Sequence, residues 1–186
     1  MHIAPIERSD LNAAKRVIAT VVCEYYFDRR FTTDELLVRY EESGYLADLD
    51  RMEEEYDGRR GIFLGAFDGK TVVGTGGVRQ LDADTGELVR LWLLQDFRGR
   101  GFGRQIVEAL LQFVRSTRWQ RVRLDTSLHC TEAVKLFRKF GFREIEPYKE
   151  SIGDCFMQLD IAEPPNKAPE PTTTAVTPRA IESIFE

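Results

Sequence analysis

The feature that most constrains this chain is a glycine- and arginine-rich loop between an apolar segment and a helix-like segment. Residues 91–104 read LWLLQDFRGRGFGR, with three glycines at alternating positions among three arginines. Alternating glycines allow a tight turn with converging backbone N–H groups, and the following helix adds unpaired amides and the positive end of its dipole. We predict that this loop binds an anion, and the three arginines favour a pyrophosphate over a single carboxylate.

Two other phosphate-binding loops fit these residues poorly. A Walker A loop requires GxxxxGK[ST], and no lysine follows the glycines here. A Rossmann fingerprint requires GxGxxG in a parallel βαβ unit, whereas the glycine spacing differs here and the preceding segments are expected to pair antiparallel. The remaining alternative is a glycine-rich turn that binds nothing.

Hydrophobic periodicity predicts an α+β order of elements around the loop. A helix is expected from about Leu11 to Asp28, and a second helical region from Thr33 to Tyr56. The period then becomes two, and Asp68-Gly69 is typical of a β-hairpin turn. Further helices are expected at 102–114 and 132–140, and strands at 2–6, 61–67, 70–81, 87–94, 121–128, 142–148 and 151–161. We therefore expect a mixed, mostly antiparallel sheet of six or seven strands with helices on both faces.

Charge divides the chain into three blocks. Residues 97–143 contain 11 Lys and Arg against three Asp and Glu, whereas residues 1–96 have 12 against 19 and residues 144–186 have three against nine. Such segregation is expected of a protein that binds an anion on one side and a cation on another, or of exposed helix faces in uneven register. A nucleic-acid-binding domain is the weaker interpretation, because the arginines lack interleaved aromatic residues and the net charge is −5.

Cysteine usage and hydropathy bear on location. Cys23, Cys130 and Cys155 are odd in number and lack CxxC spacing, so we expect neither a disulfide framework nor a metal site. Apolar runs stay well short of the roughly 18 residues that a membrane span needs, and the N-terminus is too polar for a signal peptide. We expect a cytoplasmic protein without a membrane partner, with one domain over residues 1–162 and a Pro/Thr-rich tail over residues 163–186 that is dispensable for catalysis.

Two segments of the chain resemble the GNAT superfamily of N-acetyltransferases. Arg98, Gly101 and Gly103 match the family's acetyl-CoA motif [QR]-x-x-G-x-[GA], and residues 133–142, AVKLFRKFGF, look like the family's later helix and next strand. The order of elements from residue 2 to 161 is similar too. The resemblance implies transfer of an acetyl group from acetyl-CoA to an amine, without a metal, in a cleft where two central strands splay apart. It leaves a homodimer open.

The resemblance also implies the roles of individual residues. Glu87 looks like the glutamate that often acts as general base, directly or through water, although an ordinary strand-edge carboxylate would look the same. The backbone of Leu93 is the expected contact for the developing oxyanion. Cys130 stands where relatives often carry an asparagine. The residues expected to contact the cofactor are Leu93, Leu94, Arg98, Gly99, Arg100, Gly101, Phe102, Gly103, Arg104 and Cys130.

One position departs from the family pattern. Members that protonate the leaving thiolate with a tyrosine usually have Leu-Tyr where this chain has Leu136-Phe137, and a phenylalanine has no proton to give. Water, Tyr148, Ser127 or Cys130 could take that role, since a thiol of pKa about 8.5 leaves readily as thiolate. Phe137 is predicted to be a packing residue. The missing tyrosine also favours the alternative function, a CoA-binding regulatory module without turnover.

The acceptor is not legible from the sequence. The acidic block 1–96 favours a cationic small molecule, or a lysine or N-terminal amine of a protein. Tyr25, Tyr26 and Tyr45 are expected either to line the acceptor pocket or to pack in the core. His129 could contact the cofactor or lie in a solvated loop.

Overall fold

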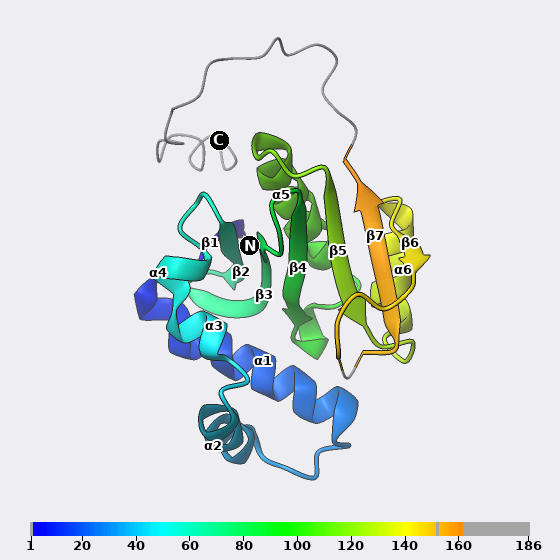
Figure 1. Ribbon diagram of the computed structural model, residues 1–186. Coiled ribbons are helices and arrows are strands. Elements are labelled where there is room, and N and C mark those ends of the chain that lie inside the picture. The colour runs from blue at the N-terminus through cyan, green and yellow to red at the C-terminus, as the bar shows by residue number, and fades with distance from the viewer. Residues whose placement is uncertain (1, 152, 162–186) are drawn as a thin grey trace.

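The computed structural model describes residues 2–151 and 153–161. These residues form one seven-stranded sheet in the order β1-β2-β3-β4-β5-β7-β6 (Figure 1). Its strands are β1 (His2–Pro5), β2 (Gly61–Asp68), β3 (Thr71–Gln80), β4 (Thr85–Leu93), β5 (Arg121–Thr126), β6 (Arg143–Ile145) and β7 (Cys155–Asp160). The helices are α1 (Leu11–Tyr26), α2 (Thr33–Ser43), α3 (Ala47–Asp50), α4 (Met52–Glu55), α5 (Phe102–Ser116) and α6 (Thr131–Lys139), with short 3₁₀ turns at Arg8–Asp10 and Gln95–Phe97.

The pairing confirms a mixed, mostly antiparallel sheet. Strands β4 and β5 are parallel neighbours, and the other neighbouring strands are antiparallel. The predicted hairpin between β2 and β3 turns at Gly69, whose φ of +61° is the left-handed conformation that such a tight turn needs. A parallel pair requires a crossover, and α5 supplies it between β4 and β5.

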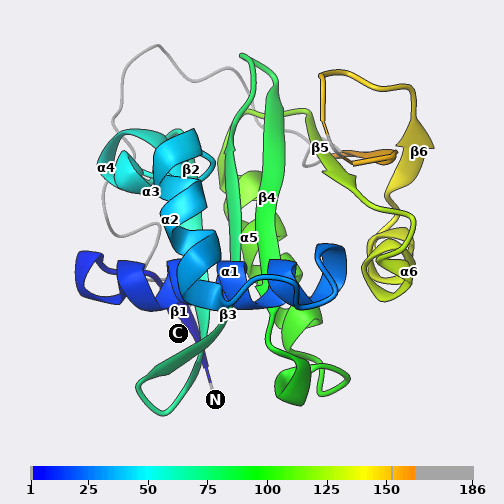
Figure 2. The same ribbon diagram turned by 90° about the horizontal axis from the view of Figure 1, so that it is seen from below.

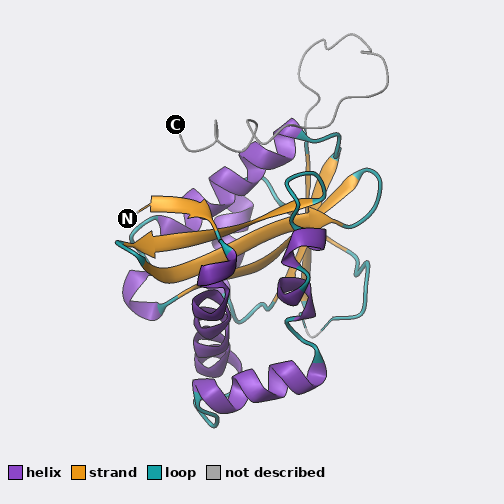
Figure 3. Cartoon of the chain, turned by 90° about the vertical axis from the view of Figure 1, so that its left-hand side faces the viewer, coloured by secondary structure: helices purple, strands orange, loops and turns teal. Residues whose placement is uncertain are grey.

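Helices cover both faces of the sheet, as the periodicity predicts (Figure 3). On one face α5 and α6 pack on the strands through fully buried side chains such as Ile106 and Leu110. On the other face α1 and α2 pack through Ile18 and Leu36, which share a second core with Phe63 of β2. Figure 2 shows α1 crossing in front of β4, with α2 beside it on the same side of the sheet, while α5 lies behind β4. Because each face has its own core, the strands between them are held on both sides.

Three further observations complete the fold. No helix among residues 2–151 and 153–161 is both long and apolar enough to cross a bilayer. Cys23, Cys130 and Cys155 are buried free thiols. The predicted tail, residues 163–186, lies outside the described residues, so the predicted domain boundary at residue 162 stays a prediction.

Candidate functional site

The parallel strands β4 and β5 pair over a short length and then part. Thr85 is paired with Arg121, Gly86 with Val122 and Glu87 with Arg123. Beyond Glu87 and Arg123, β4 and β5 no longer pair with each other. We call the place where they separate the fork. It lies at the centre of the sheet, where β4 still pairs with β3 and β5 still pairs with β7.

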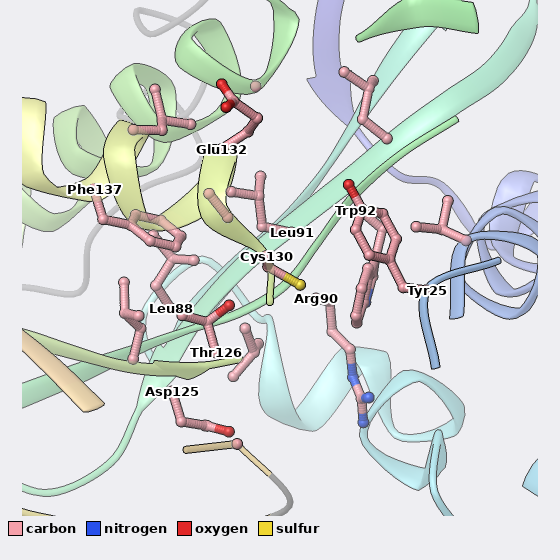
Figure 4. A pocket seen from close by; sticks show the side chains of 18 of the residues that line it. Tyr25, Leu88, Arg90, Leu91, Trp92, Asp125, Thr126, Cys130, Glu132 and Phe137 are labelled. Atoms are coloured by element: carbon pink, nitrogen blue, oxygen red, sulfur yellow. The ribbon is translucent and has the colours of Figure 1, made fainter. Parts of the chain in front are cut away.

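A cavity of about 940 Å³ opens along the parted strands (Figure 4). It reaches from the glycine loop and the start of α6 past β4 to residues beside the fork. Eight of the residues predicted to contact the cofactor line it: Leu93, Arg98, Gly99, Gly101, Phe102, Gly103, Arg104 and Cys130. Leu94 and Arg100 do not: Leu94 packs against both cores and the Arg100 guanidinium lies 5.7 Å from the centre of the Phe97 ring.

The glycine loop leaves the first turn of α5 open. Gly101 is the N-cap residue, and having no side chain it cannot accept a hydrogen bond from the first-turn amides. Gly99 and Gly101 have φ values of +73° and +88°, and a Cβ added at either would meet no atom within 4 Å. The glycines therefore serve the backbone conformation, and the space beside them is free for a ligand. Gly103, two residues further and within the first turn of α5, lines the cavity as well.

The three arginines of the loop differ in their contacts. The Arg98 guanidinium turns back, donating from Nε to the Leu93 carbonyl at 2.8 Å and from Nη2 to Glu24 at 3.2 Å. Arg104 pairs with Glu108 one turn along α5, at 2.8 Å. Lys135 and Lys139 of α6, which the sequence analysis did not single out, line the cavity as well. Four of the 11 basic residues of the block 97–143 thus line this end of the cavity, together with Glu132, and we call it the loop end.

Leu93 directs its backbone polar groups away from β3. The Leu94 N–H donates to the Val73 carbonyl at 3.0 Å, so Val73 and Leu94 form a hydrogen-bonded pair. The adjacent pair, Gly74 and Leu93, is then of the non-bonded kind, because the two kinds alternate along antiparallel strands. The bond from Arg98 to the Leu93 carbonyl agrees with this orientation. Since β4 and β5 have parted at this level, the Leu93 N–H faces the cavity side without a strand partner among the described residues.

A bulge in β4 precedes Leu93. The register with β3 shifts between Thr75 and Gly77, and opposite this shift Arg90 has a φ of +58°, which is rare for an arginine. Its guanidinium donates to both oxygens of Asp48, at 2.8 and 3.3 Å. Burial is the largest influence on the Asp48 carboxyl and raises its pKa, but the bonds from Arg90 and Tyr56 outweigh it and hold that pKa below its usual value. This buried ion pair anchors the bulge.

Glu87 lies at the fork, with its side chain 2% exposed. Its Oε1 accepts from Lys149 Nζ at 2.7 Å and from the Tyr148 hydroxyl at 3.0 Å, and its Oε2 accepts from Arg79 at 3.2 and 3.3 Å. Glu87 does not line the cavity, whereas Arg79 and Lys149 do. A proton passing from the cavity to Glu87 therefore has to pass one of these partners. Its role as general base stays a prediction.

Lys149 joins Glu87 to a second carboxylate. Its Nζ lies 2.6 Å from Asp125 Oδ1, and Asp125 also accepts from the Ser151 hydroxyl. Burial, the largest influence, lowers the pKa of Lys149, but the bonds and charges of Asp125 and Glu87 outweigh it and raise that pKa above its usual value. We call the part of the cavity lined by Arg79, Asp125 and Lys149 the fork end. Figure 4 shows Asp125 and Glu132 at different ends of the cavity.

Aromatic side chains of α1 and β4 stand over the cavity. Tyr25, Tyr26 and Tyr45 all line it, which answers the open question of pocket or core. The Tyr26 hydroxyl lies 3.7 Å from Cys130 Sγ, and its ring meets the Trp92 ring edge to face at 6.4 Å. Trp92 Nε1 is buried without a hydrogen-bond partner among the described residues. Tyr26, at the end of α1, thus contacts both Trp92 of β4 and Cys130 at the N-terminus of α6.

The residues that could protonate the leaving thiolate in place of a tyrosine at position 137 differ in whether they line the cavity. Phe137 is 3% exposed and packs edge to face on Phe142 at 5.6 Å, as a packing residue would, and it also lines the cavity. Tyr148 donates its hydroxyl to Glu87, and Ser127 is 5% exposed and does not line the cavity. Cys130 does line it. His129 is not among the lining residues either.

The sequence analysis missed most of the fork end. Arg79, Asp125 and Lys149 come from β3, β5 and the segment between β6 and β7, so no local spacing connects them. The available signal was charge inside predicted strands, since a buried charge needs a partner. The described residues contain no group of three or more His, Cys, Asp or Glu side chains that could hold a metal ion.

Comparison with known families gives one match of long extent. The model of the Acetyltransferase (GNAT) family matches residues 22–142. The uncharacterized N-acetyltransferase YjgM of Escherichia coli is 28% identical over 162 residues, which cover 81% of this chain and 87% of that protein. An uncharacterized N-acetyltransferase of Dictyostelium discoideum is 34% identical over 62 residues, covering 33% of this chain and 29% of that protein.

Solved structures share the fold. A GNAT-family acetyltransferase from Staphylococcus aureus superposes with a TM-score of 0.69 at 20% identity, covering 86% of this chain and 98% of that one. The PaiA N-acetyltransferase of Thermoplasma acidophilum, solved with coenzyme A, superposes with a TM-score of 0.67 at 19% identity, again covering 86% and 98%. The fold of this chain is therefore shared with these structures.

Proposed function

The chain belongs to the acetyltransferase (GNAT) family, and from this membership we propose that it transfers the acetyl group of acetyl-CoA to a primary amine of a small molecule or a protein. The family makes it an acetyltransferase, which outweighs the alternative of a regulatory module without turnover. Acetyl-CoA is the expected donor, because structural neighbours were solved with coenzyme A or acetyl-CoA. The amine acceptor and the residue roles below are the proposal.

The loop end suits the pyrophosphate of CoA. Open amides at the start of α5 and the positive end of the helix dipole favour an anion there. Arg104, Lys135 and Lys139 add positive charge on the same walls. From this loop, the cavity continues along the parted strands to Leu93.

One observation carries the proposal of acetyl transfer. Leu93 turns toward the cavity an N–H that has no strand partner in the described part of the chain, at the level where β4 and β5 have separated. We propose that this N–H donates to the thioester carbonyl and stabilises the oxyanion that develops there. A fixed backbone donor is well suited to this task, because it needs no reorganisation when charge appears.

The reaction also requires two proton movements. The amine nitrogen attacks the carbonyl carbon and the C–S bond breaks, so that the ammonium proton has to leave and the thiolate takes one up. A lysine-like amine of pKa about 10.4 costs roughly 4.6 kcal/mol to deprotonate at pH 7. We propose that Glu87 draws this proton through its hydrogen-bonded neighbours rather than by contact. Tyr26 and Cys130 are the proton-bearing groups beside the path of the thiol.

An acetylation assay tests the proposal. The full chain is incubated with acetyl-CoA and a panel of primary amines, and release of free CoA is measured together with the mass of the acetylated amine. Acetylation of at least one amine, lost when the amine is replaced by its N-methylated tertiary analogue, is the expected result. Binding of acetyl-CoA by calorimetry without acetylation of any amine in the panel would contradict it.

The proposal assigns the activity to residues 1–162. A chain truncated after Ala162 is expected to keep its cooperative melt and its kcat, because the described sheet is complete at β7. Loss of either in the truncated chain would place part of the domain in residues 163–186.

A further inference from the structure

The acidic excess of residues 1–96 does not reach the cavity. The charged residues of that block that line it are both basic, Arg79 and Arg90. Its acidic residues include Asp34 and Glu53, whose side chains are 76% and 82% exposed. They also include Asp48, whose carboxylate is ion-paired with Arg90. The charge of the block as a whole is therefore no guide to the acceptor, and the charges of the lining residues have to be considered instead.

Two cations stand side by side at the fork end. Arg79 and Lys149 grip the two oxygens of the same carboxylate, that of Glu87, which keeps them adjacent. Both side chains remain about a third exposed, at 30% and 32%, although Glu87 itself is only 2% exposed. Buried Glu87 thus binds both Arg79 and Lys149, and these two side chains line the cavity while Glu87 does not.

Both cations have N–H donors that no described residue accepts from. Arg79 commits Nε and Nη2 to Glu87, and no described residue accepts from its Nη1. Lys149 gives two of its three N–H groups to Glu87 and Asp125. Arg90 differs, because its guanidinium is engaged by Asp48 and by the Tyr45 carbonyl and its side chain is 15% exposed. Arg79 and Lys149 are therefore the pair that can grip an anion.

Asp125 places a negative group beside this pair. It lines the cavity with its side chain 20% exposed, and it stands on β5 just beyond the fork. Glu150, the next residue after Lys149, lines the cavity as well, so this region presents two cations and two carboxylates, a pattern complementary to a molecule that carries both an anionic group and an ammonium. A purely cationic acceptor could pair with these carboxylates but would leave the free donors of Arg79 and Lys149 without an anionic partner.

We propose that Arg79 and Lys149 bind a carboxylate of the acceptor, so that the acceptor is a zwitterionic amine of the amino-acid class. This inference rests on the proposed function, since it names the substrate class of the same site. Asp125 faces the ammonium of the bound acceptor, and Glu87 is the positioning residue that holds both cations. Polyamines and simple alkylamines are then poor acceptors.

Matched pairs of amines test the proposal on the unaltered chain. Each pair consists of an amino acid and its decarboxylated amine: phenylalanine with phenethylamine, lysine with cadaverine, and γ-aminobutyrate with propylamine. The expected result is a kcat/KM at least tenfold higher for the carboxylate-bearing member of at least one pair, arising mainly from KM. Equal or higher values for the decarboxylated members throughout would overturn the inference while leaving the proposed function intact. Absence of acetylation with every amine would instead overturn the proposed function.

Variants assign the preference to the two cations. In Arg79→Gln or Lys149→Gln, the ratio of kcat/KM for the carboxylate-bearing amine to kcat/KM for its decarboxylated partner is expected to fall at least tenfold, mainly through a raised KM of the carboxylate-bearing amine, with the calorimetric affinity for acetyl-CoA little changed. Arg59→Gln, at an exposed position outside the cavity, is the matched control. A preference that survives in both folded variants would overturn the assignment. If a variant does not fold, the matched pairs on the parent chain still decide the substrate class.

Discussion

The loop end and the fork end of the cavity are built in different ways. At the loop end, one continuous segment supplies open backbone amides, and glycines give that backbone its shape. At the fork end, the side chains of Arg79, Asp125 and Lys149 come from three separate elements and hold one another through Glu87. A backbone site of the first kind suits a constant chemical group such as a pyrophosphate. A side-chain site of the second kind can change its ligand by substitution.

The largest expected effect concerns the buried ion pair of Asp48 and Arg90, which anchors the bulge of β4. Asp48→Asn leaves Arg90 buried without its partner, which should lower the free energy of unfolding by about 3 kcal/mol. Because the pKa of Asp48 is lowered on folding, its stabilisation is fully present above its unfolded pKa, about 3.9, and is lost as the pH falls through the lower folded value. Urea unfolding at pH 7 and below pH 4 measures this.

The control for that variant is Asp34→Asn, which removes an exposed partner of Arg16. Its effect should stay within about 0.5 kcal/mol. An equally small effect for Asp48→Asn would show that the ion pair does not anchor the bulge. If the comparison of the two ends is right, Asp48→Asn also leaves the affinity for acetyl-CoA within about twofold at a temperature where the variant is folded.

The next effect isolates the loop end. Gly101→Val and Gly69→Val each place a β-branched residue at a positive φ in open space, so both should lose about 1–2 kcal/mol of stability through backbone strain. Gly101 alone lines the cavity. Calorimetry should find the acetyl-CoA affinity reduced about 100-fold or more in Gly101→Val and unchanged in Gly69→Val. Equal affinities in the two variants would contradict the assignment of the loop end.

Glu87→Gln examines the fork end by its pH dependence. We expect kcat at pH 7 to fall about 10- to 100-fold, because a relayed base contributes less than one in contact, and rising pH to restore much of it as free amine accumulates. The KM for acetyl-CoA should not change. A loss of the same size from pH 6 to 9, with a raised acceptor KM, would leave Glu87 only the task of holding Arg79 and Lys149.

The smallest effect is expected at Phe137. Phe137→Leu removes part of a ring that packs on Phe142 and should cost about 1 kcal/mol of stability. The pH profile of kcat should be the same as in the parent, because the ring carries no proton. A new or shifted basic limb in that profile would show that Phe137 affects the protonation of the leaving thiolate.

The same contrast explains what could be predicted from the sequence. The fold follows from local patterns: alternation gave the β2–β3 hairpin, and the turn at Asp68-Gly69 is where the structure has it. The loop end was predicted for the same reason, since Gly99 to Arg104 are neighbours in the chain and their glycine spacing has a direct conformational meaning.

The fork end could not be predicted in this way. Glu87 is 61 residues from Tyr148, and its contact with Lys149 exists only because β7 returns beside β5. The bulge at Arg90 could not be predicted from a glycine in the sequence. A positive φ usually requires glycine, but here the ion pair with Asp48 holds an arginine in that conformation. Net charge over residues 1–96 favoured a cationic acceptor because it counts exposed and lining residues alike.

We propose above all that acetyl-CoA binds to the backbone of the glycine loop. A titration of the ¹⁵N-labelled chain with acetyl-CoA, following the backbone amide resonances, tests this binding site. The largest shifts are expected at Gly99, Gly101, Phe102, Gly103 and Arg104, with a further shift at Leu93 and none at Gly69. Saturable binding that leaves the amides of residues 99–104 unshifted would show that the cofactor binds elsewhere.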